Sequence, residues 1–169
     1  MYRDIMMAIF SGDTEQFDIL VRQHSVDVTV VTEPDKWNFL HRALVSVSKT
    51  ADPRMIRHLI ESGIPINAKD RYGNTPLYYA ARAKNIEAMR SLLDAGAKVD
   101  PVNGDGITPL RELLLKKPYN LEAIDLLLSR GADMHQSNKG GISVKEYAKI
   151  VAHGNNATLL DLFEKYDHG

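Results

Sequence analysis

The side chains with the greatest chemical potential in this 169-residue sequence are six histidines, and they are scattered along the chain. No two of them stand four residues apart, and no His-Glu-x-x-His segment occurs, so the sequence does not predict a zinc-hydrolase helix. The chain contains no cysteine, which excludes disulfides, thiolate metal sites, zinc ribbons and a cysteine nucleophile. We therefore expect no catalytic residues, no metal site and no cofactor.

One short segment, Asn103-Gly104-Asp105-Gly106, has the composition of a calcium-binding or phosphate-binding loop. It lacks the alternating acidic ligands and the closing glutamate of a calcium loop. It also lacks the Gly-Lys-Ser/Thr ending of a phosphate loop. Asn, Gly and Asp are favoured in tight turns for their backbone conformations alone. The segment therefore predicts a turn.

The overall charge is nearly balanced, with 21 Lys and Arg against 22 Asp and Glu, for a net charge of −1. Binding to a nucleic-acid backbone requires a basic field, so we expect no nucleic-acid partner. No apolar run approaches the roughly 18 residues of a membrane span, and the first ten residues do not form a signal peptide. We expect structure to begin close to Met1, no membrane association and a cytoplasmic location, which the absence of cysteine also fits.

The sequence repeats itself at a spacing of 33 to 35 residues, which is the period of ankyrin-type arrays. The segment Gly73-Asn74-Thr75-Pro76-Leu77 returns 33 residues later as Gly106-Ile107-Thr108-Pro109-Leu110. A second block, Gly63-Ile64-Pro65-Ile66-Asn67, returns after 33 residues as Gly96-Ala97-Lys98-Val99-Asp100. It returns once more, 35 residues further on, as Gly131-Ala132-Asp133-Met134-His135. Each repeat therefore contains a segment that starts a helix and a glycine that ends one.

The residues of each repeat predict two short helices. Thr75 and Thr108 are favourable N-caps, and the proline that follows each of them is favoured at the first helical position. Asn38 and Asp52 have the same capping chemistry, and Ser143 with Glu146 predicts a capping box. The first helices are predicted at about 2–10, 40–49, 77–84, 110–117 and 145–152. The second helices, with apolar residues at helical spacing, are predicted at about 14–24, 53–62, 86–95, 121–130 and 156–166.

The third repeat strongly resembles an ankyrin repeat, because its Gly-x-Thr-Pro-Leu segment and its Leu92-Leu93-Asp94-Ala95-Gly96-Ala97 segment stand at the proper separation. The fourth matches nearly as well, although it carries Glu112-Leu113-Leu114 where small residues are expected and two extra residues near Pro118. The other repeats diverge, as terminal caps do. The resemblance implies an all-α ankyrin-repeat solenoid in which hairpin-like loops join helix-turn-helix units. We expect one domain over residues 1–169, with units at about 1–32, 33–67, 68–102, 103–137 and 138–169.

The resemblance also implies a protein-binding module without chemistry, in which loop tips and first helices line a concave binding side. His41 stands at the family's structural histidine position, which implies packing or capping. Trp37 could be exposed at its tip, or it could pack on a capping unit or under the Ser46–Asp52 turn, and both alternatives stay open. Tyr72 beside Arg71 is the stronger candidate, since Trp, Tyr and Arg are enriched at interface hot spots. The predicted partner-binding residues are Lys36, Trp37, Lys69, Arg71, Tyr72, Asn74, Arg82, Asp105, Ile107 and Lys116.

Charge is distributed unevenly between the two sets of predicted helices. The first helices carry ten basic and three acidic residues, and the second helices carry six basic and nine acidic residues. Cations are favoured near helix C-termini, and this explains Lys84, Lys116 and Lys117 better than it explains Arg42, Arg82 and Lys145. We therefore predict a basic concave side that holds one protein partner with an acidic surface.

Three functions fit these observations to different degrees. The first is a binder, monomeric when free, that occludes its partner as an inhibitor or as the immunity protein of a cognate toxin, by analogy with bacterial cytosolic ankyrin proteins of similar size. The alternative is a scaffold or host-directed effector that recruits a partner without inhibiting it, which requires a second binding surface. An enzyme would need a pocket with convergent polar groups, and no motif in the sequence points to one.

Overall fold

The computed structural model describes residues 1–45, 51–153 and 156–167. Within them the chain forms ten helices and no strand, which confirms the all-α prediction. The first helix of each pair is α1 (Tyr2–Ser11), α3 (Phe39–Leu44), α5 (Pro76–Arg82), α7 (Pro109–Glu112) or α9 (Val144–Ala152). The second is α2 (Thr14–Gln23), α4 (Pro53–Glu61), α6 (Ile86–Asp94), α8 (Leu121–Ser129) or α10 (Ala157–Tyr166).

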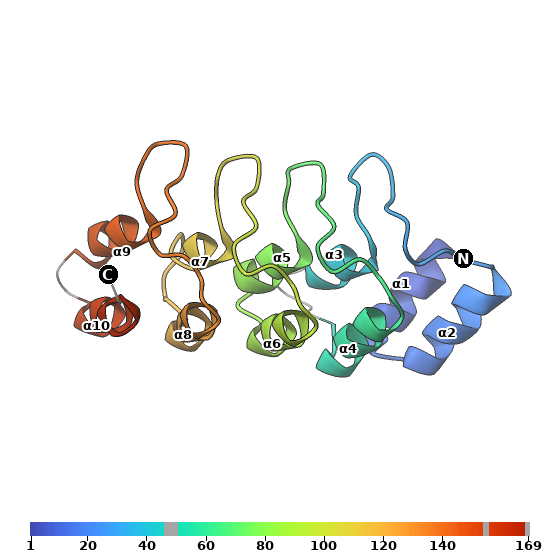
Figure 1. Ribbon diagram of the computed structural model, residues 1–169. Coiled ribbons are helices and arrows are strands. Elements are labelled where there is room, and N and C mark those ends of the chain that lie inside the picture. The colour runs from blue at the N-terminus through green and yellow to red at the C-terminus, as the bar shows by residue number, and fades with distance from the viewer. Residues whose placement is uncertain (46–50, 154–155, 168–169) are drawn as a thin grey trace.

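The helix pairs stack side by side along one axis, with the N-terminus at one end and the C-terminal pair at the other (Figure 1). Each first helix contacts the second helix of its own pair, and neighbouring pairs also contact each other, as in α3 against α5 and α4 against α6. The loops that lead from one pair to the next project from the same side of the stack (Figure 1). A single apolar core runs through the whole stack. Such a stack buries the apolar stripe of every helix only because each pair has neighbours.

The predicted helix starts are confirmed by hydrogen bonds. The Thr75 hydroxyl accepts from the Tyr78 amide, the Thr108 hydroxyl from the Arg111 amide, and Asp52 caps α4. The Asn38 side chain caps α3, and Ser143 with Glu146 forms the predicted capping box. The glycines at 63, 96 and 131, which follow the second helices, have the positive φ angles expected of helix-ending residues.

The prediction of a helix over 110–117 was wrong, because α7 ends at Glu112. After it, the Leu114 and Leu115 amides donate to carbonyls three residues back instead of four, so the chain tightens into turns. In a continuous helix, Pro118 would clash with the carbonyl of residue 114. The two extra residues of this unit are accommodated in the turns that follow.

Some predicted features lie outside the described residues. The continuation of the second predicted first helix to residue 49, with Lys49, is one of them, and so are most of the Ser46–Asp52 turn and His168. In the described part of the chain, no helix has both the length and the apolar character that a membrane span requires.

Candidate protein-binding site

The loops end in four tight turns, here called the loop tips. In each tip, the amide of the first residue donates to the carbonyl of the last, at 2.8–3.2 Å. In three tips, the side chain of the first residue, which is Asp or Asn, also accepts the amides of the residues two and four positions on. These hydrogen bonds fix the tip backbone without any partner. The four loop tips are Thr32–Trp37, Asp70–Asn74, Asn103–Ile107 and Asn138–Ile142.

Neighbouring loop tips are joined by backbone hydrogen bonds. The Arg71 amide donates to the Asp35 carbonyl at 3.0 Å, and the Gly104 amide donates to the Tyr72 carbonyl at 2.7 Å. The fit is close, since a Cβ on Gly73, whose φ is +81°, would lie 3.0 Å from the Gly104 nitrogen. The first three tips therefore form one continuous surface.

Asp70 lies beneath this surface, is only 4% exposed and accepts several hydrogen bonds. Besides the amides of Tyr72 and Asn74, it accepts the Tyr79 hydroxyl at 2.7 Å and the Trp37 indole N–H at 3.3 Å. Burial alone would raise the pKa of Asp70, but the hydrogen bonds from Tyr79, Asn74 and Tyr72 outweigh it and hold that pKa below its ordinary value. Burial, together with the hydrogen bond to Asp70, raises the pKa of Tyr79 to about 12. A buried carboxylate thus ties two units together.

Trp37 packs between units, which decides between the two alternatives left by the sequence. Its indole bonds to Asp70 in the next unit, its ring meets Tyr79 edge-on, and the Arg42 guanidinium lies 4.5 Å from the ring centre. His41 is fully buried, caps α3 with Asn38 and lies 3.1 Å from the Asn74 carbonyl through Nε2, so its predicted packing and capping role is confirmed. Burial lowers the pKa of His41.

Two of the predicted contact residues are not free at the surface. Asn74 is 7% exposed, because its amide and side chain bond to Asp70 and its side-chain oxygen accepts Asn103. The prediction that Asn74 is an open tip position is therefore corrected. Ile107, at the equivalent position one unit later, is partly buried against the core. At these two tips the position after the tip glycine is therefore turned toward the fold, and Asn74 also bonds to the neighbouring tip.

The exposed centre of the loop tips is formed by Tyr72 and Arg71. Tyr72 is 59% exposed, and the Arg71 guanidinium lies 5.1 Å from its ring centre. Arg71 also reaches the Asp35 carboxylate at 3.7 Å. Because the Tyr72 backbone is held from both sides, the structure presents an ordered aromatic and cationic pair to solvent.

The other predicted contact residues do not form one patch. Lys36 and Asp105 are exposed on their own tips, and the ammonium of Lys69 bonds to the Val102 carbonyl. Arg82 is exposed at the end of α5. Lys116 is exposed but lies in the turns after α7, so its placement on a first helix is corrected.

The prediction of a basic side formed by the first helices is weakened by three cations that are engaged inside the fold. Arg111 is 5% exposed, donates to the Ile142 carbonyl at 2.8 Å and lies over the Tyr147 ring. Lys145 pairs with Asp167 and Glu164 of the C-terminal unit. Arg42 is stacked on Trp37, as described above. The position of a cation on a first helix does not show whether its side chain is bonded within the fold or free at the surface.

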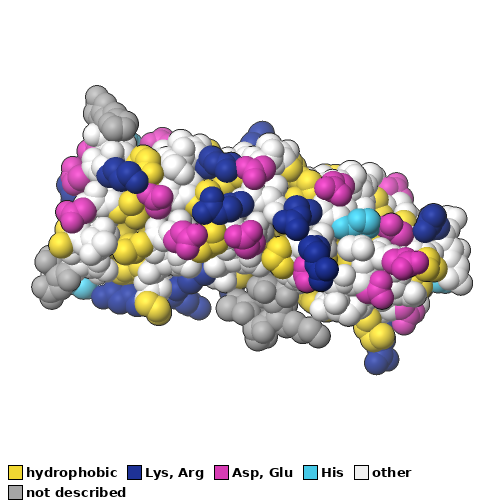
Figure 2. Space-filling view, turned by 90° about the horizontal axis from the view of Figure 1, so that it is seen from below, with side chains coloured by type: hydrophobic (Ala, Val, Ile, Leu, Met, Phe, Trp, Pro, Cys, Tyr) yellow, Lys and Arg dark blue, Asp and Glu magenta, His cyan; other side chains and the backbone are white. Residues whose placement is uncertain are grey.

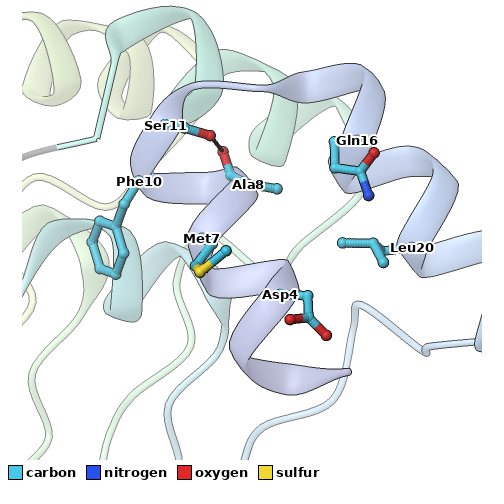
Figure 3. A pocket seen from close by; sticks show the side chains of 7 residues that line it. All are labelled: Asp4, Met7, Ala8, Phe10, Ser11, Gln16 and Leu20. Atoms are coloured by element: carbon cyan, nitrogen blue, oxygen red, sulfur yellow. Dashed lines mark hydrogen bonds between the residues drawn. The ribbon is translucent and has the colours of Figure 1, made fainter.

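A hollow at the N-terminal pair could be mistaken for an active site (Figure 3). Its volume is about 630 Å³. The Asp4 carboxylate there is paired with the N-terminal amino group at 2.7 Å, and the Ser11 hydroxyl bonds to the Ala8 carbonyl. Its polar groups thus serve local structure and do not converge on a substrate. It is lined by Asp4, Met7, Ala8, Phe10, Ser11, Gln16 and Leu20.

The candidate site also contains no cluster for a metal. Among the described residues, no group of three or more His, Asp or Glu side chains could hold a metal ion. The segment 103–106 is a loop tip, in which Asn103 accepts the amides of Asp105 and Ile107, as its turn composition predicted.

Asp100 is the clearest destabilising group of the loops. Its Oδ2 accepts the Asp133 amide at 2.8 Å, but its buried Oδ1 accepts no hydrogen bond in the described part of the chain. Burial raises the pKa of Asp100, and the charge of Asp133 adds to the rise, against the opposing Asp133 amide bond. In the preceding unit the equivalent acceptor is neutral: the Asn67 side chain accepts the Lys98 amide at 2.9 Å.

We expect Asp100→Asn to stabilise the protein by about 0.5–1.5 kcal/mol at pH 7, measured by urea unfolding. A raised pKa means that the folded state binds the proton more tightly than the unfolded state, so the cost of the charge begins above the ordinary Asp pKa and is complete above the raised folded-state pKa. The gain should therefore vanish as the pH falls below the ordinary Asp pKa of about 3.9. Asp105→Asn, on an exposed tip, is the control and should change little. An equal gain at pH 7 and at low pH would contradict the argument.

The fold places the protein in the class of helical repeat solenoids. Its candidate interface is a row of preorganised loop tips. A family model for ankyrin repeats (3 copies) matches residues 5–103 and 45–138, and the chain belongs to the ankyrin-repeat family. Repeats of this family are generally protein–protein interaction modules without catalytic activity.

Similar curated proteins come from animals. The chain is 36% identical over 114 residues, 66% of its own length, to ankyrin repeat, SAM and basic leucine zipper domain-containing protein 1 of Dasypus novemcinctus. It is 30% identical over 128 residues, 75% of its length, to the protein of the same name from Ornithorhynchus anatinus. It is 36% identical over 92 residues, 53% of its length, to tyrosine-protein kinase Shark of Drosophila melanogaster. It spans 24%, 26% and 10% of these relatives, respectively.

Sequence reasoning missed Asp70, the residue on which the candidate site is built. A signal was present, because Asp or Asn recurs at 70, 103 and 138, each at the start of a turn segment. It also missed that Arg111 is buried, although Arg111 stands at the position that His41 occupies in its own unit. That position is internal in both units.

Proposed function

We propose that this chain is a non-catalytic binder, a single array over residues 1–169, that holds one partner protein against its loop tips and occludes the surface it covers. The observation that carries the proposal is the preorganised and exposed Tyr72–Arg71 pair, whose backbone is hydrogen-bonded to both neighbouring tips. An interface whose side chains and backbone are ordered before binding loses less conformational entropy on association. Tyr and Arg are also among the residue types that dominate interface hot spots.

Inhibition of an enzyme or neutralisation of a cognate toxin is the specific form of occlusion that we propose. The binder is monomeric when free and acts in the cytoplasm, a reducing compartment that suits a chain without cysteine. The test is affinity capture with the tagged chain, identification of the captured protein by mass spectrometry, and measurement of that protein's own activity. A tight 1:1 complex with loss of activity supports occlusion, whereas many weak partners would contradict it.

Recruitment without inhibition is the second candidate. The names of the relatives combine ankyrin repeats with SAM and leucine zipper domains, or describe a tyrosine kinase, so that such repeats accompany other functions in one chain. A captured partner that keeps its activity while bound favours this candidate over occlusion.

The partner on the loop tips is proposed to have an acidic surface. Arg71 and Arg82 are both exposed, and complementary charge acts mainly on the association rate. We expect Arg71→Glu with Arg82→Glu to slow association about tenfold or more at about 0.1 M salt and to reduce its salt dependence. Stopped-flow or surface-based kinetics measure both quantities. Unchanged association with unchanged salt dependence would exclude an acidic partner surface.

A further inference from the structure

A second charged surface lies where the first helices end, away from the Tyr72–Arg71 pair in sequence. Four exposed cations stand there, and none of them forms an ion pair within the described residues. A fifth, Lys84, is half-buried beside them. We call these residues the basic ridge, which consists of Arg82, Lys84, Lys116, Lys117 and Lys149.

The basic ridge is continuous across three units. The Lys84 ammonium donates to the carbonyls of Lys116 and Pro118, at 3.3 and 2.6 Å, so the end of α5 adjoins the turns after α7. The Tyr119 hydroxyl donates to the Val151 carbonyl at 3.4 Å, which connects those turns to the end of α9. Lys and Arg side chains gather along the lower left edge of Figure 2, over the C-terminal half of the stack.

The carboxylates near this charge are partly engaged elsewhere. Glu112 accepts the Tyr78 hydroxyl at 2.8 Å. Glu146, near Lys149 on α9, accepts the Ser143 amide at 2.8 Å. The hollow beside Lys84 includes Glu87 and Glu122, which lie at the N-terminal ends of α6 and α8. Glu122 is already paired with Arg90 at 3.4 Å. Elsewhere on the same face, over the second helices, basic and acidic side chains are intermixed (Figure 2). The basic ridge therefore differs from the rest of this face.

Helix dipoles explain only part of the basic ridge. Arg82 and Lys149 lie in the last turns of α5 and α9, where the dipole favours cations. Lys116 and Lys117 lie four and five residues beyond the end of α7, outside the last turn in which the dipole acts. Both lysines are exposed and are not placed by a helix dipole, so their charges are available to a partner.

A mostly apolar hollow of about 540 Å³ is lined in part by Lys117. The Lys117 ammonium lies 5.8 Å from the centre of the Tyr119 ring on its wall. A side chain entering this hollow would contact apolar surface while its flanking residues passed the ammonium groups. The hollow is lined by Lys117, Pro118, Tyr119, Leu121, Ala152 and Asn156.

We propose that the basic ridge is a second binding surface, which takes an extended acidic peptide segment with one apolar anchor residue in this hollow. The carboxylates of the segment face Lys116, Lys117 and their neighbours, and the anchor side chain packs against Tyr119. The proposal does not depend on the loop tips, since its peptide test changes none of their residues. Arg82 is the one ridge residue that the test of the tip partner also changes. A surface of this kind would let the chain hold one protein by its tips and a second by its edge.

The test uses the full chain and a fluorescent synthetic peptide of about ten residues, made of Glu and Ser with one central Leu. Binding is measured by fluorescence anisotropy at about 0.1 M and about 0.5 M salt. We expect Lys116→Glu with Lys117→Glu to weaken binding at least about tenfold, because two attractive charges become repulsive. The control, Lys98→Glu with Arg57→Glu, makes the same charge change at exposed positions outside the basic ridge and the loop tips and should change the affinity less than about twofold.

Two further measurements separate the alternatives. Replacing the central Leu of the peptide by Gly should weaken binding about fivefold or more, and no change would overturn the apolar anchor. A single-stranded RNA of equal charge serves as competitor. If the RNA binds more tightly than the peptide and loses this affinity in the Lys116→Glu, Lys117→Glu variant, the peptide assignment is overturned. Equal peptide binding by wild type and that variant, with both folded by circular dichroism, overturns the proposal as a whole.

Discussion

Replacing Asp70 with alanine is expected to lower the free energy of unfolding by about 3–5 kcal/mol, which is at the upper end of single-residue effects. The substitution leaves the Tyr79 hydroxyl and the Trp37 indole N–H without their acceptor. It also removes the acceptor of two tip amides. An unsatisfied buried donor costs about 1–3 kcal/mol, and local relaxation recovers part of the total. Urea unfolding at neutral pH measures the loss.

The matched control is Asn103→Ala, in the equivalent position one unit later. Asn103 accepts the amides of Asp105 and Ile107 and donates to Asn74, but it receives no buried hydroxyl or indole. We expect its loss to cost about 1–2 kcal/mol. If Asp70→Ala lowers the free energy of unfolding no more than Asn103→Ala does, the buried hydrogen bonds of Asp70 do not contribute the stability proposed here.

The cost of Asp70→Ala should also depend on pH. The pKa of Asp70 is lowered in the folded state, so the folded state binds this proton less tightly than the unfolded state does. The stability that the charge contributes is therefore complete above the ordinary Asp pKa of about 3.9, and it is lost as the pH falls through the lowered value. The difference between wild type and Asp70→Ala should narrow in acid.

Replacing Tyr72 with alanine is expected to weaken binding of the tip partner by about 2–4 kcal/mol, which is a loss of about 30-fold to 1,000-fold. Tyr72 is the most exposed aromatic side chain in the described part of the structure. Its backbone carbonyl, which accepts the Gly104 amide, is unaffected by the change, so the tip keeps its conformation. Isothermal titration with the captured partner measures the loss, and thermal unfolding should change little.

Ile150→Ala is the control for this prediction. Ile150 is an exposed apolar residue on α9, 52% exposed and remote in sequence from Tyr72. The partner should bind this variant with unchanged affinity. If Tyr72→Ala and Ile150→Ala leave the affinity equally intact, the loop tips are not the site of the captured partner. A selective loss with Ile150→Ala would move the site to the C-terminal unit.

The sequence determined the repeat, the helix pairs and their ends. Caps such as Thr75 and Ser143 and the glycines after the second helices act through bonds within a few residues, so their identities are sufficient to predict them. The period of 33 to 35 residues then predicts the stack, because a lone pair cannot bury its apolar faces. The helix predicted over 110–117 ends at Glu112, because the chain tightens into turns ahead of Pro118.

Only the tertiary structure decided which of the polar and aromatic residues remain free. Trp37, Asn74 and Arg111 have the residue types of an interface, yet each is bonded to a neighbouring unit at a sequence distance of about thirty residues. Such contacts depend on the stacking distance and on the register between units, which short-range patterns do not encode. The same stacking brings Lys84, Lys116 and Lys117 together into the basic ridge. The sequence alone shows that these residues are charged, while their availability to a partner follows from how one unit packs on the next.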